Sequence, residues 1–355
     1  MNPAPFVIKA GPRALARIRN EGLAPEQFRV MVGASGGPKW FILSGLDRYL
    51  AGEFFRGRRS SLNLLGSSVG GWRMAAHASA DPAAALQRFR DHYHHLRYPK
   101  KATVQMISQS SRDMIEVMLG SDGGEAVCRN DVFKLHLITA GCRPLAQVEQ
   151  RALQLSGLLL AAGANALKRR WLAGFYHRSL FHVTGSDAPF LELMDYPTER
   201  VALTPRNLPK ALEATGAIPL VLEGVRDIEG SRHRVHRDGG IVDYHFDVPF
   251  APDSDDLVLY PHFYDRTIPG WFDKGLSWRR PRPAHYDNVV LIAPSKELVA
   301  SLPFGKISDR KDFNLLDDDS RIRYWQQVID ASERLAEDFA ERVERQQWDD
   351  VLIPG

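Results

Sequence analysis

The stretch "LLGSSVGGW", residues 64–72, runs an apolar segment into a serine flanked by glycines. This order predicts a buried strand, a sharp turn and a helix that begins near Gly70. Ser68 is the central residue of a G-x-S-x-G pattern, with Gly66 and Gly70 two positions away on either side. A nucleophile on a sharp strand-to-helix turn has a strained backbone and needs small neighbours at those positions. The pattern therefore indicates that Ser68 is a nucleophile.

A second glycine-rich turn, "GASGGPK" at 33–39, follows the apolar residues 28–32. A phosphate-binding P-loop would need glycine at Pro38 and a hydroxyl at Trp40, and the dinucleotide pattern G-x-G-x-x-G does not fit either. What remains is a strand, a loop with several free N–H groups and a helix over about 40–50. Such amides can stabilise a developing oxyanion. The amides that we expect to do so are those of Ser35, Gly36 and Gly37.

The first half of the chain alternates strand-like and helix-like segments. Strands are expected at 29–32, 61–65 and 133–141, with a later one at 288–294. A helix is expected from Pro82, with Asp81 as its cap. This alternation predicts an α/β fold with a largely parallel sheet and helices on both faces. Catalytic groups in such sheets gather at the carboxyl ends of the strands.

The composition is that of an ordinary globular protein of 355 residues, with 44% hydrophobic and 25% charged residues. A formal charge of +3 is too small to indicate a nucleic-acid partner. Cys128 and Cys142 fit neither a metal site nor a disulfide framework, which favours a reducing compartment. The N-terminus has no apolar core of signal-peptide length. We therefore expect a cytoplasmic protein, with peripheral contact to a membrane as a further expectation.

The longest charge-free stretch is "ALQLSGLLLAAGANAL", residues 152–167. It is shorter than the roughly 20 residues that span a bilayer, and we expect a buried helix. The basic and aromatic residues at 168–171 leave an alternative, in which the helix lines an acyl pocket or lies on lipid. Residues 251–286 are expected to form irregular surface, and 320–346 a long amphipathic helix capped by Asp319 or Ser320.

The base for Ser68 is expected in "HRDGGIVDYHFDVP", residues 236–249. Asp238 precedes two glycines, Gly239 and Gly240, which allow close approach of backbones. A carboxylate within hydrogen-bond reach of a serine can act as its general base when burial raises its basicity. A second Asp-Gly-Gly at 122–124 is interpreted as a turn.

These motifs together resemble the bacterial branch of the patatin-like phospholipases. The family has a glycine-rich oxyanion loop, a G-x-S-x-G turn and a later D-G-[GA], and this chain has "GASGGPK", "GSSVGG" and "DGG" in that order. The stretch 211–225 also resembles the family's Ala-Thr-Ser-Ala-Ala-Pro segment. The resemblance covers roughly residues 28–250. It implies a three-layer αβα fold, Ser68 as nucleophile and Asp238 as base of a Ser-Asp dyad, with Lys39 at the family's usual arginine position.

Some positions depart from the family pattern. Ser35 stands where a third glycine is common, Trp40 where glycine often follows the basic residue, and residues 243–245 replace an asparagine-proline pair. His245 raises the alternative of a Ser-His-Asp triad, which we favour less than the dyad. We expect a single catalytic domain over 1–355, with a core at about 28–250 and a C-terminal extension at about 251–355 packed on it.

Other polar clusters have plainer interpretations. His92 and His95 share one helix face without an evident third ligand, so we expect a solvated face and no metal. The basic stretch 231–237 is either near the cleft or a charged edge strand.

The expected function is hydrolysis of fatty-acyl esters of lipids, with no cofactor. The alternatives are an acyltransferase or thioesterase with the same dyad, and a non-catalytic lipid-binding or regulatory protein. The expected partner is a lipid or acyl-ester substrate, and no oligomeric state follows from the sequence.

Overall fold

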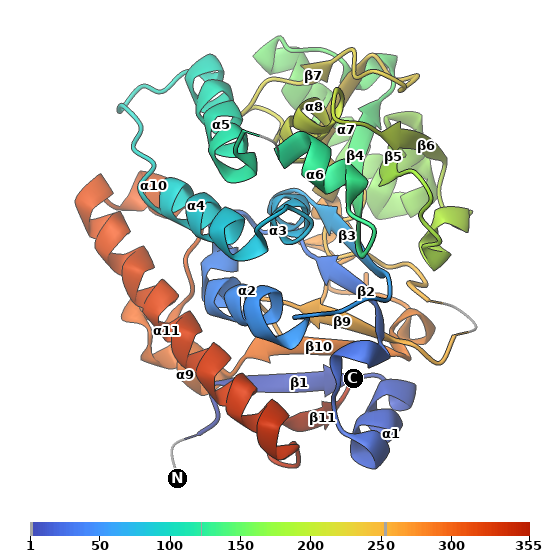
Figure 1. The fold of residues 1–355 in the computed structure, drawn as a ribbon. Coiled ribbons are helices and arrows are strands. Elements are labelled where there is room, and N and C mark those ends of the chain that lie inside the picture. Colours follow the sequence, from blue (N-terminus) through green and yellow to red (C-terminus); the bar gives the residue numbers. More distant parts are fainter. Residues whose placement is uncertain (1–2, 122, 252–253) are drawn as a thin grey trace.

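The computed structural model describes residues 3–121, 123–251 and 254–355. A mixed sheet of 11 strands runs through the molecule (Figure 1), with the spatial order β11-β1-β10-β9-β2-β3-β4-β5-β6; β8 pairs with β4 and β7 beside this path. The strands are β1 (Phe6–Ala10), β2 (Phe28–Gly33), β3 (Leu62–Ser67), β4 (Phe133–Cys142), β5 (Tyr176–Val183), β6 (Thr198–Leu203), β7 (Val225–Arg226), β8 (Val235–Asp238), β9 (Leu257–Pro261), β10 (Val289–Pro294) and β11 (Leu352–Pro354).

The centre of the sheet is parallel. Strand β2 pairs in parallel with β3 and β9, β3 with β4, and β9 with β10. The antiparallel pairs involve β1 with β10, β5 and β8 with β4, and β7 with β8. Strands β3 and β10 are buried along their whole length, as expected of central parallel strands with both faces covered. The α/β class and the mostly parallel sheet are therefore confirmed.

Helices lie on both sides of the sheet (Figure 1). Helix α3 packs on β2, β3 and β4, and α2 and α4 contact both each other and α11. The helices are α1 (Pro12–Glu21), α2 (Ser44–Tyr49), α3 (Val69–His77), α4 (Pro82–His94), α5 (Val104–Leu119), α6 (Gly123–Arg129), α7 (Arg151–Leu167), α8 (Leu208–Thr215), α9 (Lys296–Ser301), α10 (Asp312–Leu315) and α11 (Asp318–Arg345).

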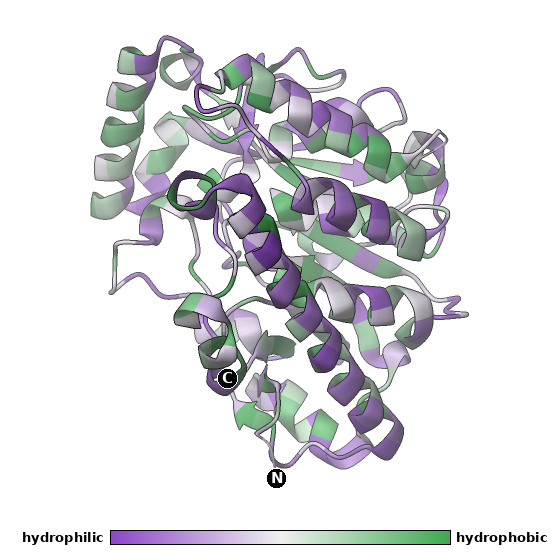
Figure 2. Ribbon diagram, turned by 90° about the vertical axis from the view of Figure 1, so that its left-hand side faces the viewer, coloured by the Kyte–Doolittle hydropathy of each residue, from purple (hydrophilic) through white to green (hydrophobic). Residues whose placement is uncertain are grey.

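Local signals place most helix ends. Helix α4 begins at Pro82, and the Asp81 side chain accepts a hydrogen bond of 3.0 Å from the Ala84 amide, as predicted. Helix α11 begins earlier than predicted, because Asp317 is its cap and accepts from the Ser320 amide at 2.9 Å. Its outward side is largely hydrophilic in Figure 2, where it crosses the front of the molecule. The helix expected over 40–50 is a 3₁₀ segment at Gly37–Leu43 followed by α2.

Two expectations about the second half of the chain are wrong. Residues 251–286 are not all irregular surface, since β9 (Leu257–Pro261) is fully buried between β2 and β10. Helix α7 is not a buried helix, since several of its leucines are exposed, including Leu159 and Leu160 at 66% and 64%. The division into a core of 28–250 and an extension stays a prediction; both β9 and β10, which follow residue 250, are strands of the one sheet.

Candidate active site

Ser68 lies on the sharp turn between β3 and α3. Its φ of 55° and ψ of −132° are strained for a residue with a side chain, and α3 begins at the next residue, Val69. The turn fits because its neighbours are glycines: a Cβ on Gly70 would overlap the Gly33 carbonyl oxygen, and one on Gly66 would lie 2.6 Å from the Gly70 oxygen. Close contact between β2 and α3 therefore brings the 33–39 loop beside Ser68.

Thr215, at the end of α8, holds the strained turn from the other side. Its Oγ1 accepts a 2.8 Å hydrogen bond from the Ser68 amide and donates one of 2.6 Å to the Ile138 carbonyl of β4. Sequence reasoning did not single out this residue, although it lies within the 211–225 stretch that resembles the family. Thr215 is fully buried, so both of its hydrogen bonds are shielded from water.

Asp238 ends β8, which pairs antiparallel with β4 so that Asp238 stands opposite Thr139. Its Oδ2 accepts a 2.8 Å hydrogen bond from Ser68 Oγ, and its Oδ1 accepts one of 2.7 Å from the Gly240 amide. Only 8% of Asp238 is exposed, and this burial raises the pKa of its carboxyl to about 6. The structure thus brings together two residues that lie 170 positions apart in the sequence.

Gly239 and Gly240, which follow Asp238, allow neighbouring segments to pack closely against the backbone. A Cβ on Gly239 would overlap the Ile138 carbonyl oxygen, and one on Gly240 would lie 2.7 Å from Ser35 Oγ. The 33–39 loop and the Asp238 turn are therefore in direct contact.

The amides of the 33–39 loop are not all free. The Ser35 amide donates a 2.9 Å hydrogen bond to the Tyr244 carbonyl, and Ser35 Oγ lies 2.9 Å from Ser67 Oγ. The expectation that the Ser35 N–H faces an oxyanion is therefore wrong; this residue ties the loop to the turn that bears Asp238. Within residues 3–121, 123–251 and 254–355, the amides of Gly36 and Gly37 have no recorded acceptor. Gly37 has a φ of 58°, which favours glycine.

A large cavity opens at Ser68. It has a volume of about 1020 Å³, and Ser68, Val69 and Gly37 are among its lining residues. Most of the other lining side chains are apolar, and charged residues of both signs lie along it: Lys100, Arg310, Lys311, Asp317 and Asp318. Among the apolar lining residues are Trp72, Leu96, Ile107, Met114, Val221 and Phe313.

Cationic side chains surround the site. Lys39 Nζ forms an ion pair with the Asp309 carboxylate, so this side chain is held by the C-terminal part of the chain. Lys274 Nζ lies 3.9 Å from the ring centroid of Tyr244. Burial of the ammonium, with repulsion from Lys39 and Arg310, lowers the pKa of Lys274 to about 7. Positive charge from Arg310 and Lys274 also favours the ionised form of Asp238 and partly offsets its burial.

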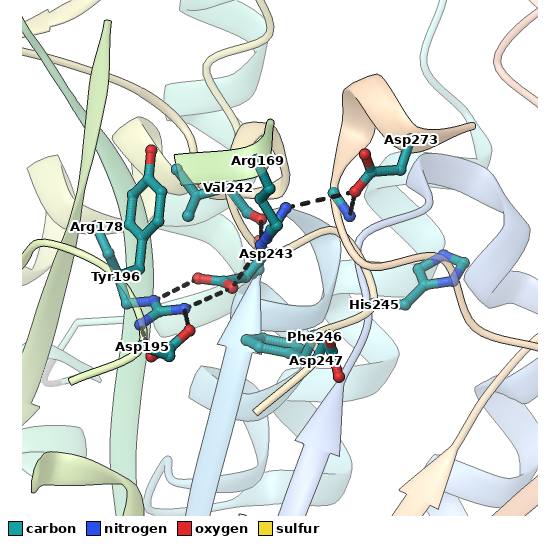
Figure 3. Close-up of polar contacts among 12 residues, drawn as sticks. Arg169, Arg178, Asp195, Tyr196, Val242, Asp243, His245, Phe246, Asp247 and Asp273 are labelled. Atoms are coloured by element: carbon teal, nitrogen blue, oxygen red, sulfur yellow. Dashed lines mark hydrogen bonds and ion pairs between the residues drawn. The ribbon is translucent and has the colours of Figure 1, made fainter. Parts of the chain in front are cut away.

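An ion-pair network fixes the segment after Asp238 (Figure 3). Asp243 is fully buried and accepts two hydrogen bonds from Arg178, from Nε at 2.7 Å and from NH2 at 2.9 Å. Arg178 also donates to Asp195, and although burial opposes the charge, these carboxylates raise the pKa of the guanidinium. Arg169 donates to the Val242 carbonyl at 2.7 Å. The chain thus anchors this segment through buried charge.

His245 does not take the place of a triad histidine in this arrangement. Its Nδ1 accepts a 3.1 Å hydrogen bond from the Ile268 amide, and burial, with nearby His262 and Lys274, holds its pKa well below the usual value. Among the described residues, the recorded hydrogen bonds to the Asp238 carboxylate come from Ser68 and Gly240.

The remaining polar clusters have structural roles. No group of three or more His, Cys, Asp or Glu residues in the described ranges could hold a metal ion. The basic stretch 231–237 is not a charged edge strand, because β8 pairs on both sides and Arg237 is buried, donating to the Leu222 carbonyl at 2.6 Å. Asp122, of the second Asp-Gly-Gly, lies outside the described residues.

Comparison with known proteins adds little. No protein-family model matches the chain, and no curated protein matches it. Among the solved structures that are similar to this chain, one covers most of it. It is VipD from Legionella pneumophila, with 10% sequence identity and a TM-score of 0.35 over 95% of this chain and 70% of that one. A likeness this weak assigns no activity, so the functional argument below is built on the geometry of the site.

Proposed function

We propose that this protein is a serine acyl hydrolase of the patatin-like type, which cleaves fatty-acyl esters of lipids through a Ser68–Asp238 dyad. The observation that carries the proposal is the 2.8 Å hydrogen bond from Ser68 Oγ to a buried carboxylate, made from a strained strand-to-helix turn. A nucleophile within reach of a base, beside free backbone amides and an apolar cavity, is the arrangement that acyl transfer requires.

In the first step, Ser68 Oγ attacks the acyl carbonyl while Asp238 takes its proton. The raised pKa of about 6 makes the carboxylate a stronger base than an ordinary aspartate, yet leaves it mostly ionised at neutral pH. The carbon–oxygen bond to the leaving alcohol then breaks, and Asp238 gives its proton to that alcohol. The product is an acyl ester of Ser68.

In the second step, water replaces the alcohol. Asp238 takes a proton from the water as its oxygen attacks the acyl carbon, and the bond to Ser68 Oγ breaks. The proton passes from Asp238 back to the serine, and a free fatty acid leaves. The same carboxylate thus acts as base and acid in each half of the reaction.

The tetrahedral oxyanion in both steps needs donors on the cavity side of Ser68. The amides of Gly36 and Gly37 are available for this role, and so is that of Val69, since the first N–H groups of a helix lack intrahelical acceptors. Loss of one such donor typically lowers kcat by about a hundred- to a thousandfold.

The substrate class follows from the cavity. Its volume of about 1020 Å³ and its apolar lining suit an acyl chain, and small-molecule sites generally combine such walls with a few placed polar groups. The exposed cations Arg310 and Lys311 would face the more polar part of a lipid at the same opening.

Labelling by a fluorophosphonate probe tests the proposal. The folded protein should become labelled, and Ser68→Ala should abolish both labelling and release of fatty acid. Ser79→Ala is the matched control, since Ser79 follows the other end of α3 and bonds only to the Ala76 carbonyl at 2.7 Å. Turnover should rise with pH as Asp238 ionises near pH 6.

Three results would contradict the proposal. Absence of labelling in folded wild-type protein would remove the nucleophile, and equal labelling of Ser68→Ala would place it elsewhere. Release of transacylation products in place of free acid, when a lipid alcohol is added, would assign the dyad to acyl transfer.

A further inference from the structure

Helix α7 buries Leu158 and Ala161 but also two polar side chains, and it turns most of its leucines outward. In an ordinary surface helix the apolar stripe faces the core and polar residues face water. Here Gln154 and Asn165 are buried against the protein, whereas Leu153, Leu159 and Leu160 are 59%, 66% and 64% exposed. The helix therefore presents its hydrophobic side outward.

The inward polar contacts fix this orientation. Gln154 Oε1 accepts a 2.9 Å hydrogen bond from the Leu220 amide, and its Nε2 donates to the Val148 carbonyl at 3.2 Å. At the other end, Asn165 Nδ2 donates to Asp273 Oδ1 at 2.7 Å. Rotation of α7 to bury its leucines would break these bonds and leave buried polar groups unpaired, which is costly.

The outward face offers almost nothing polar to water. Its one hydroxyl, Ser156 Oγ, donates to the Ala152 carbonyl of the same helix at 3.0 Å. Around it the apolar surface is concentrated: of the 14 large hydrophobic side chains exposed in the described residues, five lie on α7 and two in the 3₁₀ segments that contact it, Pro144–Ala146 and Arg169–Gly174. Exposed apolar surface gathered in this way marks a site of interaction. The seven are Leu145, Leu153, Leu155, Leu159, Leu160, Leu167 and Trp171.

Charge identifies the partner. Residues 151–170 contain no Asp or Glu and four cationic residues; Arg169 pairs inward with Asp243 and Asp273, which leaves Arg151, Lys168 and Arg170 exposed. A second copy of this chain would bring the same positive charge to the contact. Anionic lipid headgroups would be attracted to it, and a tryptophan such as Trp171, 50% exposed, suits the headgroup zone.

We propose that the outward face of α7 docks flat on the surface of a membrane that contains anionic lipid. At 17 residues the helix is about 25 Å long, and none of the helices in the described part of the chain is long and apolar enough to cross a bilayer. An apolar face with basic flanks is the pattern of a helix that lies in the interface.

Docking in this way would place one wall of the Ser68 cavity, the segment 218–222, beside the docked helix. Gln154 holds the segment around Leu220, and Ile218, Val221 and Leu222 of that segment line the cavity. The inference itself does not depend on the proposed function, because binding to a membrane requires no turnover.

Sedimentation with lipid vesicles tests the proposal. Vesicles of phosphatidylcholine with about a third of phosphatidylglycerol should bind the protein, and raised salt should weaken binding, since the attraction of basic residues to anionic lipid is screened. A triple variant Leu153→Ser, Leu159→Ser, Leu160→Ser should bind the vesicles at least about a hundredfold more weakly. The reason is that each substitution removes the free energy gained when a leucine side chain moves from water into lipid. Lys168→Gln with Arg170→Gln should weaken binding to the anionic vesicles and reduce its salt dependence.

The matched control replaces exposed hydrophobic residues elsewhere. Leu315 and Phe304 are 71% and 67% exposed, and α10, which ends at Leu315, lies far from α7 in Figure 1. Leu315→Ser with Phe304→Ser should leave vesicle binding unchanged. Thermal unfolding of each variant verifies its fold. The whole series is repeated in the Ser68→Ala background, where no turnover is expected, so that vesicle binding is measured independently of the hydrolase proposal.

Three outcomes would overturn the inference. The first is that the wild-type protein stays in solution when anionic vesicles are sedimented. The second is that the folded triple variant binds vesicles as well as the wild type does. The third is that the wild type binds no vesicles and forms a dimer, which the triple substitution dissociates. The last result would assign the face to a second copy of the chain.

Discussion

Replacement of Asp238 by asparagine should change the pH dependence of stability as well as abolish turnover. The side chain is 8% exposed, and burial raises its pKa from 3.8 to about 6. The folded protein therefore holds this proton to a higher pH than the unfolded chain does. The stabilisation that the protonated carboxyl provides is complete below pH 3.8 and is lost as the pH rises through about 6.

The size of the effect follows from the shift. A change of roughly two pKa units corresponds to about 3 kcal/mol in the free energy of unfolding once both states are ionised. Asparagine has nearly the same shape as aspartate and cannot ionise. Its side-chain oxygen can accept from the Gly240 amide, and its side-chain NH2 group can donate to the Ser68 hydroxyl, which turns to accept. Wild type should therefore lose about 2 kcal/mol relative to Asp238→Asn between about pH 4 and pH 7.

Urea denaturation of both proteins, followed across this pH range, measures the difference. Other titrating groups cancel when the two curves are subtracted, because they are common to both proteins. Asp131→Asn is the control, since that side chain is 97% exposed and its replacement should change stability by less than about 0.5 kcal/mol. The reasoning would be refuted if the difference in free energy of unfolding between wild type and Asp238→Asn stayed constant with pH, or if it shifted in favour of the wild type as the pH rises.

Two further substitutions test the geometry around Ser68. Gly70→Ala should destabilise the protein by about 3 kcal/mol or prevent folding, because the added Cβ would overlap the Gly33 carbonyl. Urea denaturation measures this loss. Gly52→Ala is the neutral control, because a Cβ at Gly52 would meet nothing within 4 Å. Thr215→Val should cost about 1–3 kcal/mol and lower kcat, because the Ser68 amide loses a buried acceptor, while Thr215→Ser should restore both. Equal kcat for the valine and serine variants would exclude a positioning role.

Sequence reasoning succeeded where the determining interactions are local. The G-x-S-x-G turn is set by steric contacts within a few residues, and the strand and helix around Ser68 follow from an apolar run that ends in small residues. The start of α4 is fixed by an aspartate three residues from the amide that it caps. Asp238 was proposed as the base from the two glycines that follow it, and the resemblance to a family then supported its pairing with Ser68.

The sequence-based predictions were wrong where segments far apart in the chain determine the local structure. The Ser35 amide looked free beside its glycines, but its acceptor, Tyr244, lies more than 200 residues away. Strand β9 was missed because five apolar residues lie among prolines and aromatics, and only pairing with β2 and β10 makes them a central strand.

By itself, the sequence determined the α/β class, the strained turn at Ser68 and the apolar character of residues 152–167. Only the tertiary structure decided which side of α7 faces out, because Gln154 and Asn165 each bond to a segment more than 60 residues away, at Leu220 and at Asp273. It also decided that Ser68 Oγ meets a buried carboxylate. Hydrophobicity along the chain says how much apolar surface a helix carries, whereas buried hydrogen bonds to distant partners fix where that surface points.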